Sequence, residues 1–448
     1  MVVPESLLQL LEVPGPSYSS YPTSDRFVEA FGPQAFRLAL RQRAQGARVG
    51  GMMPHALVVH TPSCELPHGY GACNRVYLRA LQAEINLHVA ELGREGKVLQ
   101  LHLGGGTLTF LAEEELQALM SMLIGAFRLE AGAEISIEAE PHTVSTKRLT
   151  SLAAMGFRHL SLGVQDCDLD VHREAHRAQP FDEVRSLIDA ARDSCFESIK
   201  LDLACGLPSQ TVASFELTLA QVAQLRPDRI ALHTCTRLPQ RFKPQRQIDG
   251  AALPAPRDLI RMRADALTIL EDQGYIPIGM DHFVLPGDAL AVAKRQGRLH
   301  RNVQGYTTQP DADLIGLGVS AIGRIGATYS QNAKTLPEYC DALSRGIFPI
   351  ACGLVLTRDD LVRRTVIMAL MCQGRVEFES IELAHLIRMR EYFSQELAGL
   401  QALVQQGLIE MAADALQLTA TGVLFADAVA MVFDRHRQVD ATRGSRII

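Results

Sequence analysis

The residues of this 448-residue chain with the most distinctive chemistry lie in one short segment, residues 60–74. It contains two cysteines and a histidine within ten positions: Cys64, His68 and Cys73. Thiolate and imidazole groups are ligands for zinc and for iron–sulfur clusters, so these three residues are candidate metal ligands. The alternative for His68 is a solvated loop residue, which is the commoner fate of a single histidine.

A run of three glycines, residues 104–106, stands before Thr107 and directly after an apolar stretch. Glycines at the exit of a strand let backbone N–H groups approach a ligand closely. A tight strand-to-helix turn needs the same residues, so this motif alone leaves both interpretations open.

Polar residues also follow the predicted strands. Glu138, Gln165 and Asp202 stand at strand ends, and Arg177 comes after the fourth strand. The carboxyl ends of parallel barrel strands converge on one mouth, so we expect these four side chains to line a single ligand site.

A second polar region combines residues 280–283 (MDHF), 299–302 (LHRN) and 304–308 (QGYTT). Its histidine, arginine, asparagine and tyrosine side chains, together with Gly305, indicate an ordered loop that meets a polar or anionic ligand. The alternative is a solvated connector.

The elements that position these residues follow a repeating pattern. Short apolar runs predict parallel strands at 56–60, 98–103, 134–140, 159–164, 198–204 and 229–233. Stretches with helical periodicity predict helices at 77–92, 113–127, 181–194, 214–225 and 256–273. Six βα repeats indicate an α/β fold whose parallel sheet curls into a partial or full barrel.

We expect four parts in the chain: an N-terminal arm (1–50), the α/β barrel (51–285), a loop and helical region (286–355) and a C-terminal helical domain (356–448). The block 276–330 is expected to be rich in loops. In the last part, helices at 358–372, 382–406 and 421–433 surround a short hairpin at 408–418, which is typical of a winged-helix-like domain.

Composition excludes several classes of protein. The net charge is −6 and there is no basic run of five residues, which argues against a nucleic-acid partner. The C-terminal domain has ten arginines and no lysine against twelve acidic residues. No signal peptide and no run of eighteen apolar residues is found, and the nine cysteines are typical of reduced thiols, so we expect a cytosolic protein without a membrane partner.

Several motifs together resemble one family. They include SYPT (20–23), GGGT (104–107), LGVQD (162–166), GLPSQT (206–211), GMDHF (279–283), the LHRNxQGYTT pattern (299–308) and the terminal SRII. This set is similar to that of the oxygen-independent coproporphyrinogen III oxidases, which are radical S-adenosylmethionine (SAM) enzymes.

The resemblance implies a radical-SAM-type partial (β/α)6 barrel and a monomeric, cytosolic protein of haem biosynthesis. Family members bind SAM and a [4Fe–4S] cluster held by a CxxxCxxC loop. They convert two propionates of a tetrapyrrole, coproporphyrinogen III, to vinyl groups and so form protoporphyrinogen IX. The resemblance assigns SAM contacts to Val58, Tyr70, Gly105, Gly106, Thr107, Glu138, Gln165, Arg177, Asp202, Thr236 and Ile322.

Some positions depart from the family pattern. Val58 stands where a tyrosine is usual, Leu103 replaces a tryptophan, Leu108 a proline and Cys235 a tyrosine. The last departure lies on the substrate side of the expected site.

The cluster loop departs most. Cys64 matches the first ligand position, but His68 stands at the second and Gly71 at the third, while Cys73 matches a cysteine that is not a ligand in the family. One hypothesis is a cluster-less, inactive paralogue that binds tetrapyrrole or cofactor. A second is an active oxidase with an altered Cys64/His68/Cys73 site. A third is zinc or haem bound by Cys64 and His68.

Overall fold

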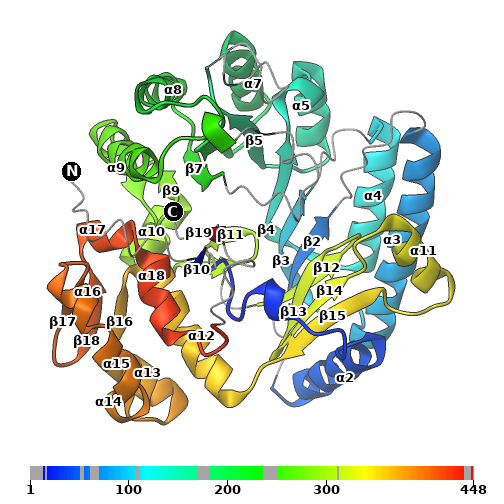
Figure 1. Cartoon of the computed structure of the whole chain (residues 1–448). Helices are drawn as coiled ribbons and strands as arrows, with labels where there is room; N and C mark the ends of the chain where they lie inside the picture. Colours follow the sequence, from blue (N-terminus) through cyan, green and yellow to red (C-terminus); the bar gives the residue numbers. More distant parts are fainter. Residues whose placement is uncertain are drawn as a thin grey trace.

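The computed structural model describes residues 14–15, 18–50, 55–60, 70–105, 111–168, 171, 181–235, 248, 250–309, 312–437 and 445–446. Figure 1 shows a curved sheet with helices along its outer face and a smaller, mainly helical domain beside it.

The centre of the sheet consists of six parallel strands, as predicted. They are β2 (His55–His60), β3 (Lys97–Gly104), β4 (Arg128–Ala139), β5 (His159–Gln165), β6 (Ser198–Cys205) and β7 (Arg229–Thr234), hydrogen-bonded in that order. The connecting helices are α3 (Tyr70–Leu92), α4 (Glu113–Ala126), α5 (Thr146–Ala154), α7 (Phe181–Asp193) and α8 (Val212–Leu225), followed by α9 (Pro256–Asp272). All but α5 match predicted helices.

Each central strand presents apolar side chains to the helices and polar ones to the inside. On β6, for example, Ile199, Leu201 and Leu203 are buried in the core between sheet and helices, whereas Lys200 lines an internal cavity of about 70 Å³. The core is therefore a shell around the barrel, and the barrel interior is polar.

The block 276–330, expected to be rich in loops, instead extends the sheet at both edges. At one edge lie β12 (Asp313–Leu317), β13 (Ile322–Ile325) and β14 (Thr328–Asn332), and β15 (Ile350–Val355), which comes after the block, continues this edge. At the other edge lie β9 (His282–Val284) and β8 (Ile276–Pro277). The expectation was wrong because most of these strands are too short for a periodic signal. Gly316 also interrupts the apolar pattern of β12. A glycine is needed there because a Cβ would lie 2.6 Å from the Ile322 carbonyl oxygen.

The hydrogen-bonded order runs from β15 to β8 without joining the two ends, so the barrel is partial. Further elements complete this part of the chain: α2 (Pro33–Gly50), α10 (Ala289–Arg295), α11 (Leu336–Ser344) and the hairpin β10 (His300–Asn302)–β11 (Gly305–Thr307).

The C-terminal domain combines short helices with a three-stranded sheet. Its elements are α12 (Arg358–Gln373), β16 (Arg375–Glu377), α13 (Phe378–His385), α14 (Met389–Tyr392), α15 (Ser394–Gly399), α16 (Gln401–Gln405), β17 (Ile409–Met411), β18 (Ala415–Leu418), α17 (Ala420–Val423) and α18 (Ala426–Ala430). The hairpin is confirmed. The single helix predicted at 382–406 is wrong, because Leu386 takes a left-handed conformation (φ 53°) that ends α13.

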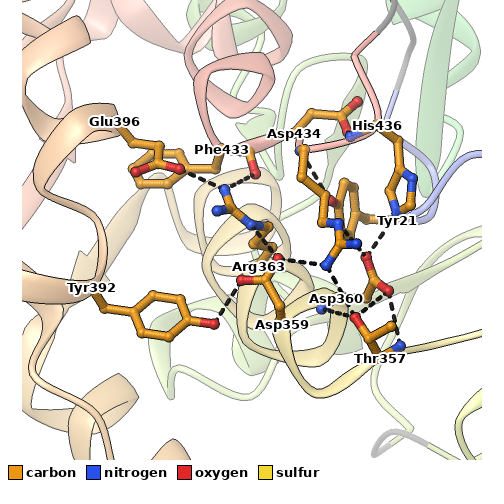
Figure 2. A network of polar contacts seen from close by, with 11 residues as sticks. Tyr21, Thr357, Asp359, Asp360, Arg363, Tyr392, Glu396, Phe433, Asp434 and His436 are labelled. Atoms are coloured by element: carbon orange, nitrogen blue, oxygen red, sulfur yellow. Dashed lines mark hydrogen bonds and ion pairs between the residues drawn. The ribbon is translucent and has the colours of Figure 1, made fainter.

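The arm and the C-terminal domain share one core and one polar network. Tyr18 and Tyr21 are fully buried among C-terminal side chains, and the Tyr18 hydroxyl donates a hydrogen bond to Asp434 at 2.8 Å. Figure 2 shows the polar network beside them, which contains Thr357, Asp359, Asp360, Arg363, Tyr392, Glu396, Asp434 and His436. Together with Arg435, which contacts Asp359 at 2.8 Å, these residues form what we call the α12 network.

Among the described helices, none combines the length and the apolar character needed to cross a membrane. The predicted boundaries of the four parts remain a prediction.

Candidate cofactor and ligand site

The barrel mouth lies at the carboxyl ends of the central strands. In the turn after β3, the backbone of Gly105 lies close to the His60 ring. Gly105 has a left-handed backbone (φ 85°), and a Cβ there would collide with the His60 ring. The Gly105 N–H donates a hydrogen bond to Glu138 Oε2 at 3.0 Å. Glycine is therefore required here both by the backbone conformation and by the close approach of His60.

Glu138, the last charged residue of β4, is held as a carboxylate. His102 Nε2 lies 3.2 Å from Glu138 Oε1, and His102 Nδ1 lies 2.8 Å from Ser136 Oγ. Burial alone would raise the pKa of Glu138, but the hydrogen bond and charge of His102, the charge of Lys200 and the Gly105 N–H together lower it to about 2.

Asp202, near the end of β6, has an equally dense set of partners. Asp202 Oδ1 lies 3.0 Å from Lys200 Nζ and 3.2 Å from His233 Nε2, and Asp202 Oδ2 accepts a hydrogen bond from Ser161. Burial opposes ionisation, yet Lys200, His233 and Ser161 hold the pKa of this carboxyl well below its usual range. A carboxylate offers about four lone-pair sites, so three donors leave room for one more.

The other predicted site residues in the described part of the chain lie on β2, β5, β13 and α3. Gln165 ends β5 with a left-handed backbone (φ 66°). Val58 is buried near the middle of β2, and Ile322 begins β13. Tyr70 and Cys73 belong to the first turn of α3. The remaining predicted site residues lie outside the described residues: Cys64, His68, Gly106, Thr107, Arg177 and Thr236.

The flanks of the cluster loop are anchored by buried contacts. The Tyr77 hydroxyl of α3 donates to the His60 carbonyl at 2.7 Å. Two helical turns further along α3, Glu84 Oε2 accepts from the Gly318 N–H at 2.8 Å and from the Tyr339 hydroxyl at 2.6 Å, and Glu84 Oε1 accepts from Asn332 at 2.6 Å. Burial raises the pKa of Glu84 to about 7 despite these donors.

The polar loop predicted at 280–308 fills the barrel interior. His282 Nδ1 lies 2.7 Å from Asp281 Oδ1, and the Arg301 guanidinium contacts Asp281 and stacks over the Tyr306 ring at 4.6 Å. Tyr306 and Gln304 line the internal cavity together with strand residues. Many polar side chains of this loop therefore bind other residues of the same loop. An ordered structure was predicted correctly, and the ligand of this loop stays a prediction.

Two sequence motifs have a structural role. Asp166 of LGVQD is fully buried and accepts hydrogen bonds from Gln210, in GLPSQT, at 2.6 Å and from Thr218 on α8. These contacts fix α8 against the end of β5 and so set the position of the mouth.

Sequence reasoning missed His60, His102, Lys200 and His233. For two of them the sequence did contain a signal, because residues two positions apart on a strand point to the same face. Lys200 stands two positions before Asp202, and His102 two positions before Gly104. Within the described residues, no group of three or more histidine, cysteine or acidic side chains is arranged to hold a metal ion.

Comparison with known proteins agrees with this geometry. The profile of the Radical SAM superfamily matches residues 70–222, and that of the HemN C-terminal domain matches residues 356–425. The fold is thus that of the radical SAM class.

Relatives are similar along almost the whole chain. The oxygen-independent coproporphyrinogen III oxidase of Escherichia coli (strain K12) is 40% identical over 441 residues, covering 96% of this chain and 95% of the relative. That of Pseudomonas aeruginosa is 40% identical over 455 residues, covering 99% and 98%. The solved structure of coproporphyrinogen III oxidase (HemN) from Escherichia coli matches with a TM-score of 0.89 and 39% identity, covering 98% of this chain and 100% of that one.

This chain belongs to the oxygen-independent coproporphyrinogen III oxidase family. The resemblance drawn from the sequence motifs is confirmed, and so is the fold class. The cofactors that the family implies are SAM and a [4Fe–4S] cluster.

Proposed function

We propose that this chain is a cluster-less, catalytically inactive member of the family that binds a tetrapyrrole or SAM. The observation that carries the proposal is the donor set of the loop: of the three positions of CxxxCxxC, only Cys64 is a cysteine, with His68 and Gly71 at the others. Thiolates hold such clusters because they are soft and anionic. Imidazole is a neutral substitute for one thiolate, and glycine has no donor at all.

The binding rim supports retention of a ligand. Gly105 keeps a backbone that no side chain could share with His60. Both mouth carboxyls stay ionised: Asp202, whose side chain is 15% exposed, and the more exposed Glu138, at 41%. Asp202 also has room for one more hydrogen-bond donor, which a ligand at the mouth could supply.

Anaerobic reconstitution with iron and sulfide tests the loss of radical chemistry. We expect far fewer than the four irons per chain of a [4Fe–4S] cluster and no 5′-deoxyadenosine after reduction with SAM present. Calorimetric titration with SAM and with coproporphyrin III tests the binding function. A full cluster with SAM cleavage would contradict the first part of the proposal, and no binding of either compound would contradict the second.

A second candidate is an active oxidase with an altered cluster site made of Cys64, His68 and Cys73. It is favoured by two thiols and an imidazole within ten residues, with Cys73 in the first turn of α3. In that case Cys64→Ala and Cys73→Ala each abolish iron binding and vinyl-product formation. Unchanged iron content in both variants would exclude it.

Zinc or haem held by Cys64 and His68 would appear in metal analysis and absorption spectra of the aerobically purified protein.

We further propose a cytosolic monomer without a nucleic-acid partner, supported by the net charge of −6 and by a C-terminal domain in which acidic residues outnumber arginines. Sedimentation analysis tests the monomeric state.

A further inference from the structure

His233 is the residue at the barrel mouth whose role neither the motifs nor the family contacts explain. It stands near the carboxyl end of β7 (Arg229–Thr234), and its side chain is 53% exposed. On the same strand, Leu232 is buried on the opposite face against the helices. His233 therefore belongs to the inward, polar face, at the level where ligands meet a parallel barrel.

One ring nitrogen of His233 is already used. His233 Nε2 lies 3.2 Å from Asp202 Oδ1, which leaves Nδ1 without a hydrogen-bond partner among the described residues. The His282 ring packs edge-on against the His233 ring, with centroids 6.5 Å apart. The imidazole is thus fixed from two sides while half of its surface remains open.

The charges around His233 favour a cation at this place. Asp202 and Lys200 face it from β6, and Asp281 and His282 face it from the segment that enters β9. The pKa of His233 is raised above its ordinary value, mainly by the hydrogen bond with Asp202 and also by the charges of Asp202 and Asp281. Burial and the charge of Lys200 lower this pKa, but their effect is smaller. In this state Nδ1 is an N–H donor.

We propose that His233, held by Asp202, binds a carboxylate group of the ligand through its Nδ1–H at the barrel mouth. This inference rests on the proposed binding function and assigns it a recognition group. The two sources of a carboxylate are a propionate of the tetrapyrrole and the amino-acid carboxylate of SAM. In either case the bond is charge-assisted, which makes it about twice as strong as a neutral hydrogen bond.

The test uses the purified full-length protein and pairs of ligands that differ by their carboxylates. Metal-free coproporphyrin III is compared with its tetramethyl ester, and SAM with decarboxylated SAM. A metal-free porphyrin ensures that iron coordination cannot contribute. We expect the wild type to bind one acid form roughly tenfold more tightly than its carboxylate-blocked counterpart, and the pair that shows the difference identifies the source.

Variants at one position complete the test. His233→Phe keeps a ring of similar size and is expected to remove the preference; His233→Gln is a second variant without a charge, in case the first does not fold. His233→Lys restores a cation and is expected to restore part of the preference. Affinity of the wild type for the acid form should fall as pH rises from about 6 to 9, since a histidine loses its proton in this range, and that slope should be absent in His233→Phe.

The outcomes separate the two proposals. Equal preference for the acid form in the wild type and in both uncharged variants would overturn the role of His233 and leave the binding function intact. Failure of the wild type to bind tetrapyrrole or SAM would overturn both. A full cluster with SAM cleavage would contradict the proposed loss of radical chemistry without touching the assignment of His233.

Discussion

The barrel mouth and the α12 network are both dense in charge, yet they differ in what their charges contact. In the α12 network, the Arg363 guanidinium binds Asp359 at 2.9 Å, Glu396 at 2.8 Å and the Phe433 carbonyl at 3.0 Å. His436 Nε2 lies 2.7 Å from Asp360 Oδ1. Figure 2 shows that these residues point toward one another across three segments of the chain.

At the mouth, the donors approach Glu138 and Asp202 mainly from inside the barrel, and His233 remains half exposed. A glycine backbone, rather than another side chain, closes the turn above Glu138. We interpret the α12 network as one that stabilises the fold and the charges at the mouth as part of the proposed ligand site. Changes in the first should alter stability alone, and changes in the second should alter both stability and binding.

The largest effect is expected for Asp202→Asn, which removes the partner of Lys200, a lysine whose side chain is only 22% exposed. Lys200 then lacks its nearest counter-charge, so the free energy of unfolding should fall by about 3–5 kcal/mol, and SAM or tetrapyrrole affinity should fall with it. Chemical denaturation and titration calorimetry measure the two quantities. The double variant Lys200→Met/Asp202→Asn should recover most of the stability. A loss below ~1 kcal/mol in the single variant would show that the mouth carboxylate is not coupled to Lys200.

Glu84 is a fully buried carboxyl on α3 whose two oxygens together accept three hydrogen bonds. Folding raises its pKa from 4.5 to about 7, so the folded state holds this proton more tightly than the unfolded chain. The contribution is therefore fully stabilising below about pH 4.5 and declines as pH rises to about 7, by about 3 kcal/mol in all.

In Glu84→Gln this part of the pH dependence should disappear, while the rest of the profile stays. Denaturation midpoints of wild type and variant between pH 4.5 and 8 measure it. Parallel profiles for the two proteins would mean that Glu84 does not change its protonation state on folding.

Arg363→Met tests the other side of the comparison. The Arg363 side chain is 13% exposed and pairs with two carboxylates, so its loss should lower the free energy of unfolding by about 2 kcal/mol and leave ligand affinity unchanged. The matched control is Arg388→Met in the same domain. That arginine is 80% exposed beside Glu391, and its loss should change stability by less than ~0.5 kcal/mol. Weakened ligand binding in Arg363→Met would break the proposed separation.

Gly105→Ala is expected to lower stability and to weaken binding at the turn after β3. Its left-handed backbone disfavours alanine by about 1 kcal/mol, and the added methyl group must also displace the His60 ring. Gly93→Ala is the control, because Gly93 has a similar φ of 77° but no atom within 4 Å of the place that a methyl group would take. Only Gly105→Ala should weaken SAM binding, and equal affinity in both variants would contradict a role for this turn in the site.

The parts of the fold that repeat could be predicted from the sequence. The apolar runs at 98–103 and 198–204 were recognisable because each is followed by a helical pattern of ordinary length, and β3 and β6 lie there. The polar residues at strand ends could be assigned to one mouth because parallel strands share a direction.

Other features needed long-range contacts that no local pattern contains. The sheet extension by β12–β15 depends on pairing between β2 and β12, which lie more than 250 residues apart in the chain. The end of α13 at Leu386 depends on a backbone conformation rather than on a breaker residue. His233 was missed because its significance arises only when β6 and β7 bring it beside Asp202.

The central claim is that this family member has lost its cluster through the residues at positions 68 and 71. It is tested most directly by anaerobic iron and sulfide reconstitution of the wild type beside the double variant His68→Cys/Gly71→Cys, which restores the CxxxCxxC spacing with Cys64. We predict that the variant gains iron toward the four atoms of a [4Fe–4S] cluster, while the wild type stays far below and yields no 5′-deoxyadenosine. A wild type that reaches the same iron content and cleaves SAM would contradict the claim.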